Sequence, residues 1–155
     1  MKVCVFSDSH GCPENLVRAV EAEKPALCFF LGDGERDLGA LRERFPDLPV
    51  YAVRGNCDLR SGLPKQLACA VGGVRIFATH GHLYDVKHDP SLFGLLRAAE
   101  GADLALFGHT HTALAERREG TVIFNPGSIG RSARPSYGVI TIGEGETRTE
   151  IRRLG

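Results

Sequence analysis

The sequence lacks a long apolar run, and this absence excludes one broad class of protein. Its longest apolar stretch, residues 25–31, ends at Gly32 and Asp33 and is far shorter than the ~20 residues that a transmembrane helix needs. The first apolar segment is short and breaks at Asp8, which is unlike a signal peptide. We therefore expect a cytoplasmic protein that does not associate with a membrane.

The sequence also lacks an excess of charge and a paired cysteine motif. Its 19 basic residues balance 19 acidic ones, whereas proteins that bind a nucleic-acid backbone usually carry a basic surplus. No long nucleic acid is expected as a partner, and a small nucleotide substrate stays open. The cysteines are odd in number and contain no Cys-x-x-Cys pair, which argues against a disulfide framework and a zinc knuckle. They are Cys4, Cys12, Cys28, Cys57 and Cys69.

A chain of 155 residues fits one domain, which we place at 1–155. Its first third alternates short apolar runs with amphipathic stretches, the order typical of a parallel α/β sheet. The predicted strands are 2–6, 27–31 and 50–53, and the predicted helices are 13–24 and 38–45.

The rest of the chain has a different pattern, in which pairs of predicted strands flank turn residues such as Gly72 and Gly73. The expected hairpins are 67–71 with 74–79, 114–117 with 122–124, and 137–142 with 148–152. A helix is predicted over 91–100 and a buried strand over 104–107. One α/β domain with antiparallel additions fits this order best.

Seven polar side chains follow the predicted strands at their carboxyl ends. Open α/β sheets bind ligands in the crevice at that edge, so five strand ends deliver this set to one place. A single histidine, or a single Gly-Asp turn, is more often structural than functional. Four of the six histidines nevertheless belong to the set, which makes separate structural explanations hard to sustain. The residues are Asp8, His10, Asp33, Asn56, His80, His109 and His111.

The chemistry of this set favours two divalent metal ions. Two carboxylates, one amide oxygen and four imidazoles suit Mn²⁺ first, with Fe, Zn²⁺ and Ni²⁺ as alternatives, and suit Ca²⁺ poorly. Seven ligands exceed the usual three of a catalytic zinc but suit two ions that share one carboxylate, for which we choose Asp33. Two such ions would keep an excess of positive charge that attracts a phosphate ester and stabilises both oxygens of a phosphoryl displacement.

Taken together, the motifs resemble those of the calcineurin-like metallophosphoesterases, in particular the compact YfcE-like phosphodiesterases. The motifs that carry the resemblance are Asp8-Ser9-His10, Gly32-Asp33, Gly55-Asn56-Cys57-Asp58, His80-Gly81-His82, Gly108-His109-Thr110-His111 and Asn125-Pro126-Gly127-Ser128. The resemblance implies a four-layer α/β–β/α sandwich of two mixed sheets flanked by helices. It also implies a water that bridges the metals as nucleophile, acting on small phosphodiesters.

The resemblance further assigns ligands to each ion. It places Asp8, His10, Asp33 and His111 on one ion and Asp33, Asn56, His80 and His109 on the other. One departure concerns the general acid. Many family members carry a histidine directly after the asparagine, where this chain has Cys57, and a thiol is a poor proton donor. His82 and metal-bound water remain candidates, and Asp58 either orients the asparagine loop or is a turn residue.

Contacts to substrate are expected from Cys57, Ser128 and Arg131, while solvated loops are an equal explanation for Arg131 and Arg134. Alternatives within the fold are a phosphomonoesterase, a protein phosphatase or a nuclease. An alternative outside enzymology is a scaffold like the retromer subunit of this fold, which lacks a complete ligand set. The complete set here favours the enzyme, and the sequence leaves a homo-oligomer open.

Overall fold

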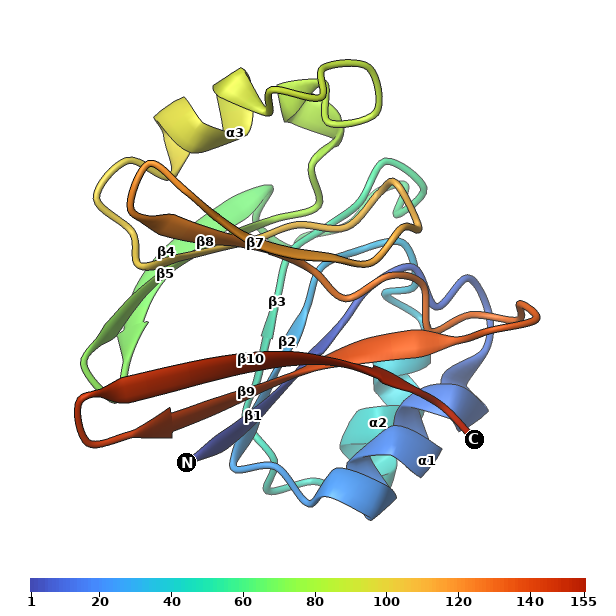
Figure 1. Cartoon of the computed structure of the whole chain (residues 1–155). Coiled ribbons are helices and arrows are strands. Elements are labelled where there is room, and N and C mark those ends of the chain that lie inside the picture. Colours follow the sequence, from blue (N-terminus) through green and yellow to red (C-terminus); the bar gives the residue numbers. More distant parts are fainter.

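The computed structural model describes residues 1–155 and contains two mixed five-stranded sheets that pack face to face (Figure 1). The first sheet has the order β10 (Glu146–Arg153), β9 (Ser136–Gly143), β1 (Lys2–Phe6), β2 (Leu27–Phe30) and β3 (Val50–Ala52). The second has the order β4 (Gln66–Val71), β5 (Val74–Thr79), β6 (Leu104–Leu106), β8 (Thr121–Asn125) and β7 (Leu114–Arg118). The helices are α1 (Pro13–Glu23), α2 (Asp37–Arg44), α3 (Phe93–Ala98) and the short 3₁₀ turn η1 (His82–Tyr84).

The helices cover the outer faces of the two sheets. Figure 1 shows α1 and α2 against the β1–β2–β3 side of the first sheet and α3 beyond the second. The order is therefore helix, sheet, sheet, helix, as the sequence predicts, although only the short α3 and η1 cover the second sheet. Strands β1, β2 and β3 pair in parallel, and β9 and β10 add antiparallel strands beside β1, which confirms the predicted arrangement.

The main apolar core lies between the sheets, because each contributes the alternate side chains that face inward. Val5 and Phe29 from the first sheet and Ile76 and Phe124 from the second belong to one cluster of buried side chains. The first sheet buries its other face against α1 and α2. Both sheets are thereby fixed relative to each other, and so are the loops that leave their carboxyl ends.

The predicted helix 91–100 is shorter than expected. The side chain of Asp89 accepts hydrogen bonds from the backbone N–H and the hydroxyl of Ser91, at 3.0 and 2.6 Å. This turn competes with helical geometry, and Leu92 then takes a left-handed backbone with φ of 53°. The helix begins only at Phe93 and ends at Ala98, so both predicted boundaries were wrong. No helix in the structure is long and apolar enough to cross a membrane.

A buried carboxylate ties the end of α1 to the first sheet. Glu23 is 5% exposed in its side chain, and it accepts hydrogen bonds from the Tyr137 hydroxyl and Arg152 at 2.7 Å and from Lys2 at 3.1 Å. Burial alone would raise the pKa of Glu23, but these donors outweigh it and hold the pKa below its usual 4.5. A depressed pKa in the folded state stabilises the fold above the unfolded pKa, and this contribution is lost as pH falls through the folded value.

We therefore expect Glu23→Gln to lower the free energy of unfolding at pH 7 by about 1–3 kcal/mol and to flatten its fall below pH 4.5. Urea unfolding at neutral and acidic pH measures both effects. Glu150→Gln is the matched control, because Glu150 pairs with the same Arg152 but is 52% exposed in its side chain. Equal pH profiles for the two variants would contradict the assignment.

Candidate metal centre

The loops after five strands, three from the first sheet and two from the second, bring the seven predicted side chains together. Asp8, Asp33 and His80 are buried at the base of the site, whereas His10 and His111 are exposed at its mouth. The Nε2 atoms of His10 and His111 lie 3.3 Å apart although 101 positions separate the residues. The set thus spans two sheets rather than one edge of a single sheet, which corrects the expectation from the sequence.

Among the predicted ligands, the nitrogen and oxygen atoms form two groups, in each of which all atoms lie within 4.8 Å of one another, and a third group of this kind joins His10 and Asp33 with Cys57. The first group contains Asp8, His10 and His111, and the second contains Asp33, His80 and His109. The amide oxygen of Asn56 lies 3.0 Å from Nε2 of His80 and so extends the second group. Each of the first two groups therefore combines one carboxylate with two imidazoles.

Asp33 lies between the two groups. Its Oδ2 is 3.2 Å from Nε2 of His80 in the second group and 3.7 Å from Nε2 of His10 in the first. Its Oδ1 accepts a hydrogen bond from the backbone N–H of Cys57 at 2.8 Å, so only Oδ2 faces the imidazoles. This orientation is what a carboxylate shared between two cations requires.

Asp8 is held in a similar way, with one oxygen fixed and the other free. Its Oδ2 accepts hydrogen bonds from the Ser7 hydroxyl at 2.6 Å and the His109 backbone N–H at 3.1 Å. Its Oδ1 is buried without any hydrogen-bond partner and lies 3.2 Å from Nε2 of His111. A buried carboxylate oxygen with no donor is costly unless something positive faces it.

Five residues of the set adopt a left-handed backbone that is rare for side chains with a Cβ. The φ angles are 57° at Asp8, 42° at His10, 60° at Asp33, 68° at His109 and 60° at His111. Each such residue costs about 1–3 kcal/mol, and the cost is tolerated mainly where function requires the geometry. Nothing in the sequence marks these conformations, apart from the polar and glycine-rich character of the loops.

Asp58 fixes the asparagine loop to the loop after β2. Its carboxylate accepts hydrogen bonds from the backbone N–H groups of Asp33, Gly34, Glu35 and Gly55, at 2.8–3.0 Å. Burial alone would raise the pKa of Asp58, but these donors keep it below its usual value. Asp58 thus orients the asparagine loop. Gly55 is required in that loop, because a Cβ there would collide with the Asp33 carboxylate.

Two residues that support the ligands are not predicted from the sequence. Ser7 holds Asp8, as described above, and no pattern in the sequence marks it. Asn125 is fully buried, and its amide donates to the Gly108 carbonyl and to the Thr110 hydroxyl, both at 3.0 Å. It therefore fixes the loop that carries His109 and His111, and its place in the Asn-Pro-Gly-Ser motif was the only available signal.

The imidazoles differ in their electrostatic environment. Burial would lower the pKa of His80, but Asp33 and Asp8 outweigh it and raise the pKa above its usual value. Burial and the neighbouring His80 lower the pKa of His109 to about 4, so its ring is neutral at pH 7. A neutral imidazole has the free lone pair that a metal ligand needs.

The candidate general acid His82 and Cys57, which stands where many family members carry a histidine, are both close to the set. Cys57 is exposed, and its Sγ lies within 4.8 Å of ligand atoms of His10 and Asp33. Burial and the charge of Asp33 raise the pKa of the Cys57 thiol. Burial and the charge of His80 lower the pKa of His82, whose Nδ1 is buried without a partner. At neutral pH the Cys57 thiol is therefore a weak acid, and the His82 ring is mostly unprotonated.

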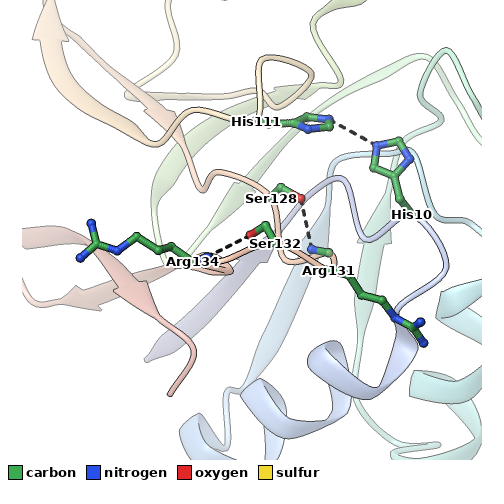
Figure 2. A pocket seen from close by; sticks show the side chains of 7 residues that line it. His10, His111, Ser128, Arg131, Ser132 and Arg134 are labelled. Atoms are coloured by element: carbon green, nitrogen blue, oxygen red, sulfur yellow. Dashed lines mark hydrogen bonds between the residues drawn. The ribbon is translucent and has the colours of Figure 1, made fainter.

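The predicted substrate contacts on the loop after β8 line one pocket beside the set. This pocket has a volume of about 370 Å³ and is lined by His10, His111, Ser128, Gly130, Arg131, Ser132 and Arg134. The side chains of Arg131 and Arg134 point away from the two imidazoles (Figure 2). Arg131 instead forms an ion pair with Glu14 at 3.1 Å, and the Ser128 hydroxyl donates to the Asp8 carbonyl at 2.7 Å. Direct substrate contacts from these residues stay predictions.

The fold and this arrangement of carboxylates and imidazoles define the class, and comparison with known proteins agrees. The chain belongs to the calcineurin-like phosphoesterase superfamily, whose domain matches residues 1–145. It is 36% identical over 149 residues to "Probable metallophosphoesterase YsnB" of Bacillus subtilis, covering 92% of this chain and 85% of that protein. It is 35% identical over 169 residues to "Phosphodiesterase YfcE" of Escherichia coli K12, covering 90% of this chain and 87% of that protein.

A solved structure of a predicted phosphoesterase from Streptococcus pneumoniae TIGR4 also matches. It has a TM-score of 0.80 and 28% identity, covering 98% of this chain and 88% of that one. The chain is thus related to small YfcE- and YsnB-like phosphoesterases, which confirms the YfcE-like resemblance predicted from the motifs. The family and these relatives identify the chain as a metallophosphoesterase, which is a hydrolase.

The residues present fit a pair of divalent cations. Four imidazoles, two carboxylates and the Asn56 amide converge in a partly buried site, and several of their nitrogen and oxygen atoms lie 3.0–3.8 Å apart. The free Oδ1 of Asp8 and the neutral ring of His109 supply electron pairs without protons to remove. The donors are oxygen and nitrogen, which suits first-row transition ions.

Proposed function

We propose that this protein hydrolyses small phosphodiesters and that it binds two divalent metal ions for the reaction, with Mn²⁺ as the first candidate. The observation that carries the proposal is the pair of ligand groups, each with one carboxylate oriented by hydrogen bonds toward two imidazoles. No structural role explains the unpartnered oxygen of Asp8 at the base of these groups. The relative named phosphodiesterase YfcE supports a diester as the substrate.

Each group would hold one ion. Asp8, His10 and His111 would bind the first, while His80, His109 and Asn56 would bind the second. Asp33 would serve both, because its Oδ2 faces His10 and His80. When bound, two such ions activate water and stabilise the charge that develops on the oxygens of a phosphate ester.

In this scheme other residues orient the two carboxylates, hold Asn56 and leave the site open to substrate. Ser7 and the backbone N–H of Cys57 aim the two carboxylates, which avoids reorganisation during the reaction. Asp58 holds Asn56 in place through the asparagine loop. The exposed His10 and His111 leave the site open, and no inserted segment covers it, which suits small substrates.

The central test is the metal content. After stripping with a chelator and reloading with Mn²⁺, we expect about two ions per chain by mass spectrometry of the metal, and activity on a diester such as bis(4-nitrophenyl) phosphate only in the loaded protein. His88→Ala is the control, because His88 is exposed and lies outside the set. Saturation at one ion per chain would overturn the two-metal scheme.

The competing functions give different results in the same assay. A phosphomonoesterase or protein phosphatase would prefer 4-nitrophenyl phosphate to the diester under identical conditions. A scaffold like the retromer subunit would bind metal without turnover of either ester. The complete set of seven side chains favours the enzyme over the scaffold.

A further inference from the structure

A second and larger pocket adjoins the metal-ligand set and shares His10 with the pocket beside the loop after β8. Its volume is about 730 Å³. His10 and Asp33 form part of its wall, so the pocket opens onto the ligand groups. The other walls are the start of α2 and the loop 57–59.

Two arginines in this pocket have no partner in the protein. Arg36 directly precedes α2 and Arg42 lies on it; both are exposed and line the pocket, and neither guanidinium makes an ion pair within the chain. Arg44, on the same helix but outside the pocket, is paired with Glu21 at 3.0 Å. Arg131, which lines the smaller pocket, likewise differs from Arg36 and Arg42, because it forms an ion pair with Glu14.

The acidic residues of the pocket do not all compete for these cations. Asp37 is buried and bonded to the Ser9 hydroxyl at 2.5 Å, and Asp58 is occupied by four backbone N–H donors. Asp33 belongs to the ligand set. Glu35 is therefore the one carboxylate of the pocket lining that is free to neutralise a cation. The two arginines thus face a single available carboxylate.

The lining of the pocket includes one large apolar side chain, Leu59. Leu59 is 84% exposed, the highest value among the large exposed apolar side chains, and it directly follows the loop residues that hold Asp33. A single exposed leucine needs no explanation by itself. Beside a catalytic pocket it offers a surface for the hydrocarbon or ring portion of a bound molecule.

We propose that this pocket binds the part of a phosphodiester that remains attached to phosphorus, and that Arg36 and Arg42 select substrates with a second anionic group on that part. Leu59 contacts its apolar portion. The inference rests on the proposed function and specifies its substrate class, which is a diester with a distal carboxylate or phosphate. The scissile phosphate would lie at the ligand groups, which the pocket wall shares through His10 and Asp33.

Two matched probes test the proposal. They are 4-nitrophenyl phenyl phosphate and its analogue with a carboxymethyl group at the para position of the phenyl ring, which share the same leaving group. The Mn²⁺-loaded protein should cleave the charged probe with a kcat/KM about 3- to 10-fold higher at low salt, mainly through a lower KM, because exposed ion pairs are weak individually. The preference should shrink in 0.5 M salt, which screens exposed charges over ~3–10 Å.

Variants of the pocket test whether its charges cause the preference for the charged probe. Arg36→Ala combined with Arg42→Ala should remove the preference, Glu35→Gln should increase it, and Arg44→Ala should leave it unchanged. Leu59→Ser should raise KM for both probes without altering their ratio. Equal cleavage of the two probes by the wild type, or a preference that survives in the double variant, would overturn the inference.

A binding measurement keeps this inference distinct from the proposed function. In NMR titrations of the metal-free protein, which does not turn the probe over, the charged probe should shift the amide signals of Gly39 and Leu59, both of which line the pocket. If the loaded protein cleaves neither probe, the proposed function fails, and these shifts still decide whether the pocket binds anions. Absence of the shifts would overturn the inference even if both probes were cleaved.

Discussion

Asp33→Asn should remove both metal ions and lower diester hydrolysis by at least about 10³-fold, while the fold survives. Oδ2 of Asp33 faces imidazoles of both ligand groups, at 3.7 Å from His10 and 3.2 Å from His80. Asparagine keeps an oxygen that can accept the Cys57 N–H, so the loop should persist. It replaces the charged oxygen with a neutral group, which withdraws charge from both cations at once.

Metal content, turnover and circular dichroism together measure this effect. Asp103→Asn is the matched control, because Asp103 is a carboxylate bound to Arg75 on the surface at 2.8 Å, far from the ligand set. It should retain both ions and full activity. An Asp33→Asn protein that holds two ions and turns over at the wild-type rate would refute the shared role of Asp33.

Cys57→His should accelerate the cleavage of diesters with poor leaving groups by up to ~10²–10⁴-fold, the usual contribution of a correctly placed general acid. The raised pKa of the Cys57 thiol makes it a weak donor near neutral pH, and the lowered pKa of His82 keeps that ring unprotonated there. Without a donor, the wild-type rate should depend steeply on the leaving-group pKa, and aryl diesters should react far faster than alkyl ones.

Rates for diesters of graded leaving-group pKa test this expectation in the wild type and in Cys57→His. The exposed position of Cys57 provides room for an imidazole, although its placement within about an ångström decides the gain. A flat dependence in the wild type would show that a proton donor already acts. His82→Ala would then identify it, since His82 is the nearest histidine outside the set, with its ring 5.5 Å from that of His80.

The elements of the fold were predictable where the pattern of side chains is local. The strands 2–6 and 74–79 coincide with β1 and β5, because alternating or continuous apolar residues between turn signals specify a strand within a few residues. The length of the helix 91–100 was overestimated because the prediction used only this local pattern. Its apolar spacing is helical from residue 91, but the turn formed by the Asp89 side chain and the left-handed backbone of Leu92 delay the start of the helix to Phe93.

The seven candidate ligands could also be chosen from the sequence, because residue type and position after a strand are local properties. Their geometry could not. His10 and His111 are 101 positions apart, and they meet only because two separate sheets pack through Val5, Phe29, Ile76 and Phe124. The residues that aim the ligands, such as Ser7, carry no mark in the sequence.

The sequence by itself therefore determined the family, the element order and the chemical identity of the candidate metal ligands. The tertiary structure alone decided which oxygen of Asp8 and Asp33 is free, which residues take a left-handed backbone, and where unpaired arginines face the site. The physical reason is the range of the interactions. Side-chain periodicity acts over a few residues, whereas hydrogen bonds and charge pairs between distant loops exist only after the two sheets have packed.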